Sequence, residues 1–73
     1  MKNTRMTHGK WLKEQRLLRG GTIDEVAELI NLHRQTIMRI EKSDNVNWSV
    51  FSDYCELMNI GYRTAAETWT NLR

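Results

Sequence analysis

The sequence contains no proline, a single cysteine and only four glycines among its 73 residues. Without proline, no predicted helix is interrupted by the residue that breaks helices most strongly. One thiol excludes an intramolecular disulfide, which fits a reducing compartment. No apolar run approaches the roughly 18 residues of a membrane span, and the basic N-terminal segment lacks the apolar core of a signal peptide. We therefore expect one small intracellular domain over residues 1–73, and the length excludes a large multidomain enzyme.

What the sequence does contain is a balance of 40% hydrophobic and 27% charged residues, which is typical of a folded domain. Its net charge of +2 is divided unequally along the chain. Residues 1–42 carry nine basic and five acidic side chains, a net charge of +4, whereas residues 43–73 carry two basic and four acidic ones, a net charge of −2. This division predicts that an anionic partner contacts the first half of the chain.

The spacing of apolar residues predicts an all-α fold, a compact bundle of about five short helices separated by turn residues. Residues 1–7 are expected to be frayed, and Gly20 with Gly21 ends the first helix. The predicted helices cover about residues 8–19, 23–30 and 34–42, a stretch that begins at residue 48, and about residues 64–71.

Local motifs mark the ends of several of these helices. Thr22 and Glu25 have the spacing of a capping box, in which each side chain accepts a hydrogen bond from the backbone N–H of the other residue. Asn31 tolerates the left-handed conformation that commonly closes a helix. Asn47 directly precedes the apolar-periodic stretch from residue 48 and suits an N-cap. Because Asn31 closes the second helix and the third begins at about residue 34, the connection between them is short, at residues 31–33.

Two helices of about eight residues, joined by a short connection inside a helical bundle, have the geometry of a helix-turn-helix. The small side chain of Ala27 lies where the second helix must approach the third closely. Apolar residues occupy the positions that face inward in such a unit: Val26, Ile30, Leu32, Ile37 and Ile40.

Over about residues 9–60 the chain resembles the lambda-repressor-like, Cro-type helix-turn-helix family of phage and bacterial transcription regulators. The segments that carry the resemblance are RGGTIDEVA at residues 19–27, TIMRIE at residues 36–41 and YCELMNI at residues 54–60. The resemblance implies that the third helix reads double-stranded DNA. It also implies a salt bridge between Arg16 and Glu41 that ties the first helix to the end of the third.

The chain departs from the family pattern at three positions. Ile23 stands where many members carry a glutamine that contacts a DNA phosphate, and an isoleucine side chain cannot donate a hydrogen bond. Gly21 stands where a leucine usually packs, and Ser43 where a glycine usually ends the third helix. These departures weaken one phosphate contact and leave the expected fold unchanged.

The third helix supplies side chains that suit base recognition. A major groove about 12 Å wide accepts one helix, whose N-terminal side chains reach the base edges. Arg34 fits guanine O6 and N7, and Gln35 fits adenine N6 and N7. Arg39, near one turn further on, reaches either bases or a phosphate, and Met38 suits contact with a thymine methyl group. The alternative is a solvated helix face or, for Met38, a surface or partner contact.

The start of the first helix and the loop after the third helix flank the groove in this family, so the resemblance implies phosphate contacts there. Thr22 begins a helix, where the dipole and free amides favour an anion. His33 either caps the third helix and also reaches a phosphate or only caps it, and a lone surface lysine is usually just solvated. The predicted phosphate contacts are Thr22, His33, Lys10, Lys42, Ser43 and Asn45.

One recognition helix reads only a few base pairs, so useful specificity requires a dimer on half-sites about 34 Å apart. Residues 61–73 are the candidate dimerisation segment, because Tyr62, Trp69 and Leu72 add apolar groups beyond what the first four helices need. The alternative is that these three side chains simply close the core.

We expect no catalytic role, no metal and no cofactor. His8, His33 and Cys55 do not share the spacing of metal ligands, and only one thiolate is available. Cys55 lies on the apolar stripe of the fourth helix, where a small buried residue is expected.

The sequence therefore predicts a sequence-specific DNA-binding transcriptional regulator. The leading hypothesis is a phage or prophage Cro-like repressor that binds a pseudo-palindromic operator as a homodimer. We expect it in the cytoplasm and nucleoid of a bacterial cell or phage-infected host. One alternative is an antitoxin-type regulator that also binds a protein partner. Another is a helical protein-interaction module without DNA binding, which the modest net charge, Ile23 and the acidic side chains of Asp24, Glu25 and Glu28 favour.

Overall fold

A computed structural model of the chain describes residues 5–72. This part of the chain forms five helices and no strand, as the sequence predicts. The fifth helix begins two residues earlier than expected, because Gly61 in an extended conformation is its N-cap. Residues 1–4 of the segment expected to be frayed lie outside the described residues, and Thr7 caps the first helix. The helices are α1 (His8–Leu18), α2 (Ile23–Ile30), α3 (Arg34–Lys42), α4 (Trp48–Leu57) and α5 (Tyr62–Asn71).

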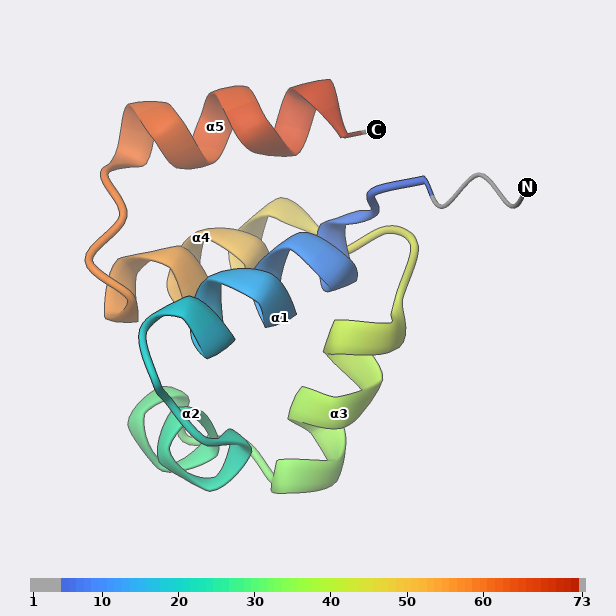
Figure 1. The fold of residues 1–73 in the computed structure, drawn as a ribbon. Coiled ribbons are helices and arrows are strands. Elements are labelled where there is room, and N and C mark those ends of the chain that lie inside the picture. Colours follow the sequence, from blue (N-terminus) through green and yellow to red (C-terminus); the bar gives the residue numbers. More distant parts are fainter. Residues whose placement is uncertain (1–4, 73) are drawn as a thin grey trace.

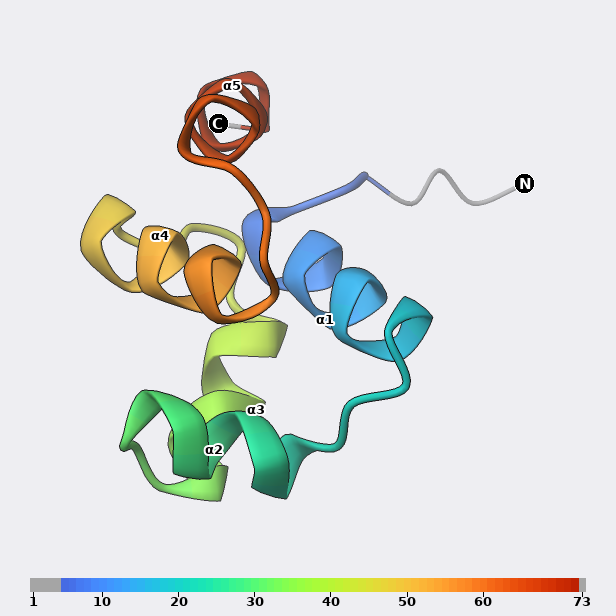
Figure 2. The ribbon, with the colours of Figure 1, turned by 90° about the vertical axis from the view of Figure 1, so that its left-hand side faces the viewer.

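The helices are arranged in layers (Figure 1). α1 and α4 lie side by side in the middle, α5 packs across one side of them, and α2 with α3 occupies the other side. The view along α5 shows the same order, with α2 and α3 together at the end of the molecule that lies farthest from α5 (Figure 2). The helix-turn-helix unit therefore forms one end of the domain.

The core lies between the layers and is built from the inward faces of all five helices. Leu32, which was expected to face inward, is instead 39% exposed, and two further leucines, Leu18 and Leu29, are 74% and 71% exposed. α2 reaches its neighbours through other side chains, and Leu32 lies in the turn before α3. The buried hydrophobic residues are Leu12, Val26, Ala27, Ile37, Val46, Phe51, Tyr54, Cys55, Met58 and Ala65.

The predicted turn and capping motifs are confirmed. Gly20 has a backbone φ of +73°, a left-handed conformation that glycine adopts without steric cost. Thr22 and Glu25 form both hydrogen bonds of the capping box. Asn31 closes α2 with φ 62° and ψ 46°, and the Asn47 side chain accepts a hydrogen bond from the Val50 N–H. Local sequence therefore sets where α1 and α2 end and where α2 and α4 begin.

α1 begins in direct contact with the C-terminal end of α3. The Gly9 N–H donates to the Ser43 carbonyl over 3.1 Å. A Cβ atom at position 9 would lie 2.4 Å from the Ile40 oxygen, 2.6 Å from the Ser43 oxygen and 2.7 Å from the Glu41 oxygen. Only glycine fits this approach, which joins the end of α3 to the start of α1.

His8 connects three segments that are distant in the sequence. Its buried ring accepts a hydrogen bond at Nδ1 from the Val46 N–H over 2.9 Å, so in the neutral ring the proton is on Nε2. Nε2 lies 2.8 Å from the Trp69 carbonyl and donates to it. The Trp69 indole N–H donates in turn to the Val46 carbonyl over 2.7 Å. These contacts hold α5 against α1 and the α3–α4 loop.

Candidate nucleic-acid interface

A buried clamp holds the C-terminal end of α3. The Glu41 carboxylate accepts hydrogen bonds from Arg16 Nε over 2.7 Å and from Arg16 Nη2 over 3.0 Å, and both residues are almost wholly buried. The Tyr54 hydroxyl donates to the same carboxylate, and Arg16 Nη1 donates to the Gly21 carbonyl over 3.0 Å. The predicted Arg16–Glu41 salt bridge is confirmed, and Tyr54 extends it to α4.

Arg16 keeps its charge and Tyr54 keeps its proton at neutral pH. Hydrogen bonding to Glu41 raises the pKa of Arg16 above its ordinary value, against the lowering effect of burial. Burial and then the hydrogen bond to Glu41 raise the pKa of Tyr54 above its usual range. Arg16 therefore stays charged and Tyr54 remains a hydrogen-bond donor, so that α1, α3 and α4 are bound together around one carboxylate.

The other end of α3 is exposed to solvent. Arg34, Gln35, Met38 and Arg39 are all exposed and lie at positions that repeat every three to four residues, so they share one side of the helix. Ile37 and Glu41 are the buried residues of α3, and Ile37 is wholly buried. The structure thus brings the four predicted base contacts together on one face. The positively charged side chains of this face are those of Arg34 and Arg39.

Arg34 already has an acidic neighbour on α2. Its Nε lies 3.1 Å from the Asp24 Oδ1 atom, and the two side chains are 60% and 75% exposed. Asp24 was considered only as one of three acidic side chains at residues 24, 25 and 28, and local spacing gives no sign that it pairs across the turn.

The residues predicted to contact phosphates flank α3 and line the starts of α1 and α2. The Thr22 N–H is occupied by the Glu25 carboxylate over 2.9 Å, which leaves the hydroxyl as the group able to donate to an anion. His33 is the N-cap of α3 by backbone conformation, but its side chain makes no capping hydrogen bond. Lys42 is exposed in the last turn of α3.

The remaining predicted phosphate contacts have partners within the chain. The Lys10 ammonium donates to the Arg5 carbonyl over 3.3 Å at an exposed position. The Ser43 hydroxyl donates to the Asn45 carbonyl over 2.6 Å and thereby shapes the loop after α3. Asn45 itself is exposed.

The three dimer candidates have different environments. Trp69 packs against the core and stacks on His8 with ring centroids 5.6 Å apart, which agrees with the alternative that it closes the core. Tyr62 is 74% exposed and meets Trp48 edge to face with ring centroids 5.5 Å apart. Leu72 is partly exposed.

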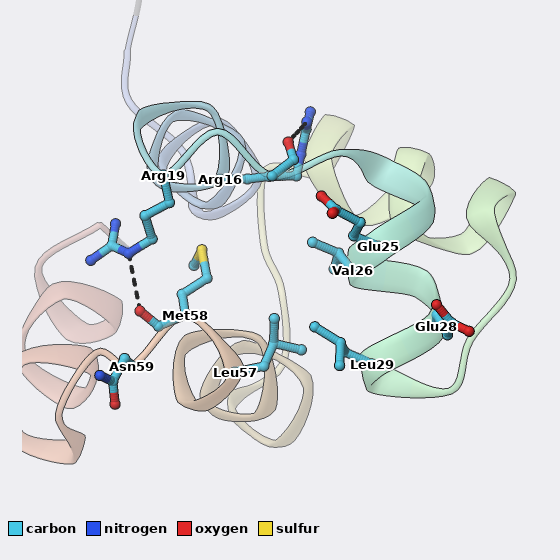
Figure 3. A pocket seen from close by; sticks show the side chains of 10 residues that line it. Arg16, Arg19, Glu25, Val26, Glu28, Leu29, Leu57, Met58 and Asn59 are labelled. Atoms are coloured by element: carbon cyan, nitrogen blue, oxygen red, sulfur yellow. Dashed lines mark hydrogen bonds between the residues drawn. The ribbon is translucent and has the colours of Figure 1, made fainter.

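A groove of about 470 Å³ lies between the end of α1, α2 and the end of α4, and none of the predicted DNA contacts lines it. Figure 3 shows Val26 and Leu29 from α2 and Leu57 from α4 turned toward this groove. At its edge the Arg19 Nε donates to the Met58 carbonyl over 3.0 Å, a tertiary contact that no sequence pattern indicated. The groove is a feature separate from the exposed face of α3.

The reactive groups of the described chain are held in structural contacts. Cys55 is wholly buried, as predicted, and burial raises the pKa of its thiol to about 11. Within residues 5–72, no group of three or more His, Cys, Asp or Glu side chains is placed to hold a metal ion, and every buried side-chain nitrogen and oxygen has a partner. No helix in the same range is long and apolar enough to cross a membrane.

Comparison with known families gives a match that covers most of the chain. A family model described as helix-turn-helix covers residues 12–61, which is more than half of the chain and extends from the second turn of α1 to the residue before α5. The matched segment contains the clamp and the exposed face of α3, whereas α5 lies beyond it. A comparison with curated proteins found no match.

Proposed function

Because the chain belongs to the lambda repressor/Cro-like helix-turn-helix family of DNA-binding transcription regulators, we propose that it is a repressor whose α3 reads bases in a major groove. Arg34 pairs with a guanine, Gln35 with an adenine, and Met38 contacts a thymine methyl group. Arg39, one turn further along, reaches a base or a phosphate.

The observation that carries this proposal is the contrast along α3. Arg34, Gln35 and Arg39 present long polar side chains to solvent, while Glu41 locks the C-terminal end of the helix to α1 and α4. A helix about 10–12 Å across fits a major groove about 12 Å wide. A rigidly held helix with its polar end exposed suits insertion there, because little conformational freedom is lost on binding.

Phosphate contacts supply the sequence-independent part of the affinity in this proposal. Lys42 ends α3 and the loop of residues 43–45 follows it, while Thr22 and His33 precede α2 and α3. Basic and hydroxyl side chains at these places fix the register of the helix on the duplex without reading sequence. The positive net charge of residues 1–42 favours this surface as the one that faces DNA.

The proposal includes a homodimer on a pseudo-palindromic operator. A helix of nine residues is about 14 Å long and spans only a few base pairs, so two copies are needed for useful specificity. Tyr62 and Leu72 offer apolar surface for that contact, with Trp69 holding α5 in place. Occupation of an operator that overlaps a promoter then blocks transcription, as in a phage or prophage repressor.

A selection from a random duplex pool followed by a salt titration tests this function. We expect one enriched sequence family with two half-sites, and an affinity that falls linearly with the logarithm of salt concentration. The slope should be about −0.9 for each phosphate neutralised. Weak binding to every duplex with a flat salt dependence would contradict the proposal and favour a protein-interaction module. An antitoxin-type regulator would bind the selected duplex and a protein partner as well.

A further inference from the structure

The ion pair between Asp24 and Arg34 joins α2 to the first residue of α3. It differs from the other ion pair of the described residues, Arg16–Glu41, in being open to solvent on both sides. Exposed ion pairs contribute little to folding stability. The ion pair itself therefore gives folding little reason for a carboxylate at this position, apart from the favourable effect of an acidic side chain in the first turn of α2.

A carboxylate beside the proposed DNA surface also opposes binding to a polyanion. Asp24 lies next to the side chain that would enter the groove, so its charge lowers the attraction of this surface for any phosphate backbone. The cost is the same for every DNA sequence. A compensating gain must come from an effect that depends on sequence.

The geometry of the pair supplies such an effect. Asp24 Oδ1 lies 3.1 Å from Nε of Arg34 as an ion-pair partner, and no residue within 5–72 accepts a hydrogen bond from Nη1 or Nη2. The outer edge of the guanidinium therefore remains open to donate two parallel hydrogen bonds to guanine O6 and N7. Holding Nε also restricts the rotation of a long side chain, so less conformational entropy is lost when the two bonds form.

We propose that Asp24 is a positioning residue for base recognition, which orients Arg34 toward one base pair and weakens binding to all other sequences. This inference rests on the proposed function. The Asp24 carboxylate then has two opposite effects. It raises discrimination at the base pair that Arg34 contacts, and it lowers the affinity of the protein for unrelated DNA.

The test compares wild type with Asp24→Asn, which keeps the size of the side chain and removes its charge. Glu28→Gln is the matched control, because Glu28 is also exposed on α2 and its side chain lines the groove next to α1 and α4. Each protein is titrated against the duplex selected by wild type, against that duplex with the Arg34-dependent base pair replaced, and against an unrelated duplex. The Arg34-dependent base pair is the one at which Arg34→Ala loses its preference.

We expect Asp24→Asn to reduce discrimination at that base pair by about 10-fold, which is within the range for one bidentate contact. Its affinity for the unrelated duplex should rise about 2-fold or more at low salt, because one negative charge is removed. Glu28→Gln should leave discrimination unchanged. Discrimination by Asp24→Asn within 2-fold of wild type would overturn the proposal.

A second readout needs no DNA. The ¹⁵N resonance of the Arg34 Nε–H in the free protein should shift in Asp24→Asn and its side-chain motion should increase, with no change in Glu28→Gln. An Arg34 resonance that is the same in all three proteins would overturn the role of Asp24. If wild type itself selects no sequence from the pool, the proposed function fails, and the positioning role fails with it. If wild type is selective and Asp24→Asn is equally selective, only the positioning role fails.

Discussion

The two ends of α3 differ in almost every physical property. At the C-terminal end, Glu41 is 5% exposed and accepts hydrogen bonds from Arg16 and Tyr54. At the N-terminal end, the Arg34 side chain is 60% exposed, and its ion-pair partner Asp24 is 75% exposed. One end is held to two other helices, whereas the other end meets solvent.

In this small domain, the residues that orient α3 are therefore different from the residues that α3 exposes to solvent. A buried ion pair is often no more stabilising than apolar residues of the same volume, because desolvation offsets the Coulombic attraction. The clamp around Glu41 instead fixes the orientation of α3 relative to α1 and α4, because three hydrogen bonds converge on one carboxylate. The side chains at the exposed end of α3 can then be substituted without loss of the fold.

The largest expected effect comes from breaking the clamp. Arg16→Ala leaves the Glu41 carboxylate buried without its cation, and we expect a loss of about 3–5 kcal/mol in the free energy of unfolding. Urea denaturation of both proteins measures it. Lys13→Ala on the exposed side of α1 is the control and should change stability by less than about 0.5 kcal/mol. A loss below about 1 kcal/mol for Arg16→Ala would mean that the clamp does not hold α3.

The next effect comes from the contact between Gly9 and the end of α3. Gly9→Ala places a methyl group against three backbone carbonyl oxygens, and we expect a loss of about 1–3 kcal/mol or more. Gly61→Ala is the matched control: its added methyl group meets no atom within 4 Å, so the loss should stay below about 1 kcal/mol, the cost of a poorer N-cap. Thermal unfolding of the two variants compares them directly. Equal melting temperatures would contradict the close approach of α1 to α3.

A smaller effect is expected from alkaline pH. The pKa of Cys55 is raised to about 11 from its ordinary value of 9.0, so the unfolded state loses this proton first as pH rises. Stability should fall by up to about 1.4 kcal/mol per pH unit between those two values. Denaturation at a series of pH values measures the slope. Cys55→Ala should show a shallower slope, and an unchanged slope would contradict burial of the thiol.

Much of the framework behind this contrast was predictable from the sequence, because short motifs encode it. The Thr22–Glu25 box, the left-handed Asn31 and the Asn47 cap depend only on neighbours three or four residues away. Arg16 and Glu41 are far apart in the chain, and their pairing was expected only through the family resemblance.

Other contacts could not be predicted because they depend on how distant segments pack. His8 bonds with Val46 and Trp69, at separations of 38 and 61 residues, and it had been considered only as a metal ligand. The close approach at Gly9 and the contact between Asp24 and Arg34 likewise appear only when helices are brought together. Periodicity placed Tyr54 on the apolar stripe but gave no partner for its hydroxyl.

The exposed end of α3 should show the smallest effect on folding and the most selective effect on binding. Arg34→Ala removes only solvent-exposed contacts, so the free energy of unfolding should change by less than about 1 kcal/mol. Lys42→Ala is the comparison for binding, because loss of a phosphate contact should weaken every duplex by a similar factor. Unfolding measurements on both variants exclude loss of the fold as the cause.

The most direct test of the division along α3 is the affinity of Arg34→Ala for the duplex selected by wild type and for versions of it with single base pairs replaced. The account predicts a loss of about 1–3 kcal/mol on the selected duplex and a preference relaxed at one base pair only. Equal losses on every duplex, or no loss on any, would contradict the assignment of the exposed end of α3 to base recognition.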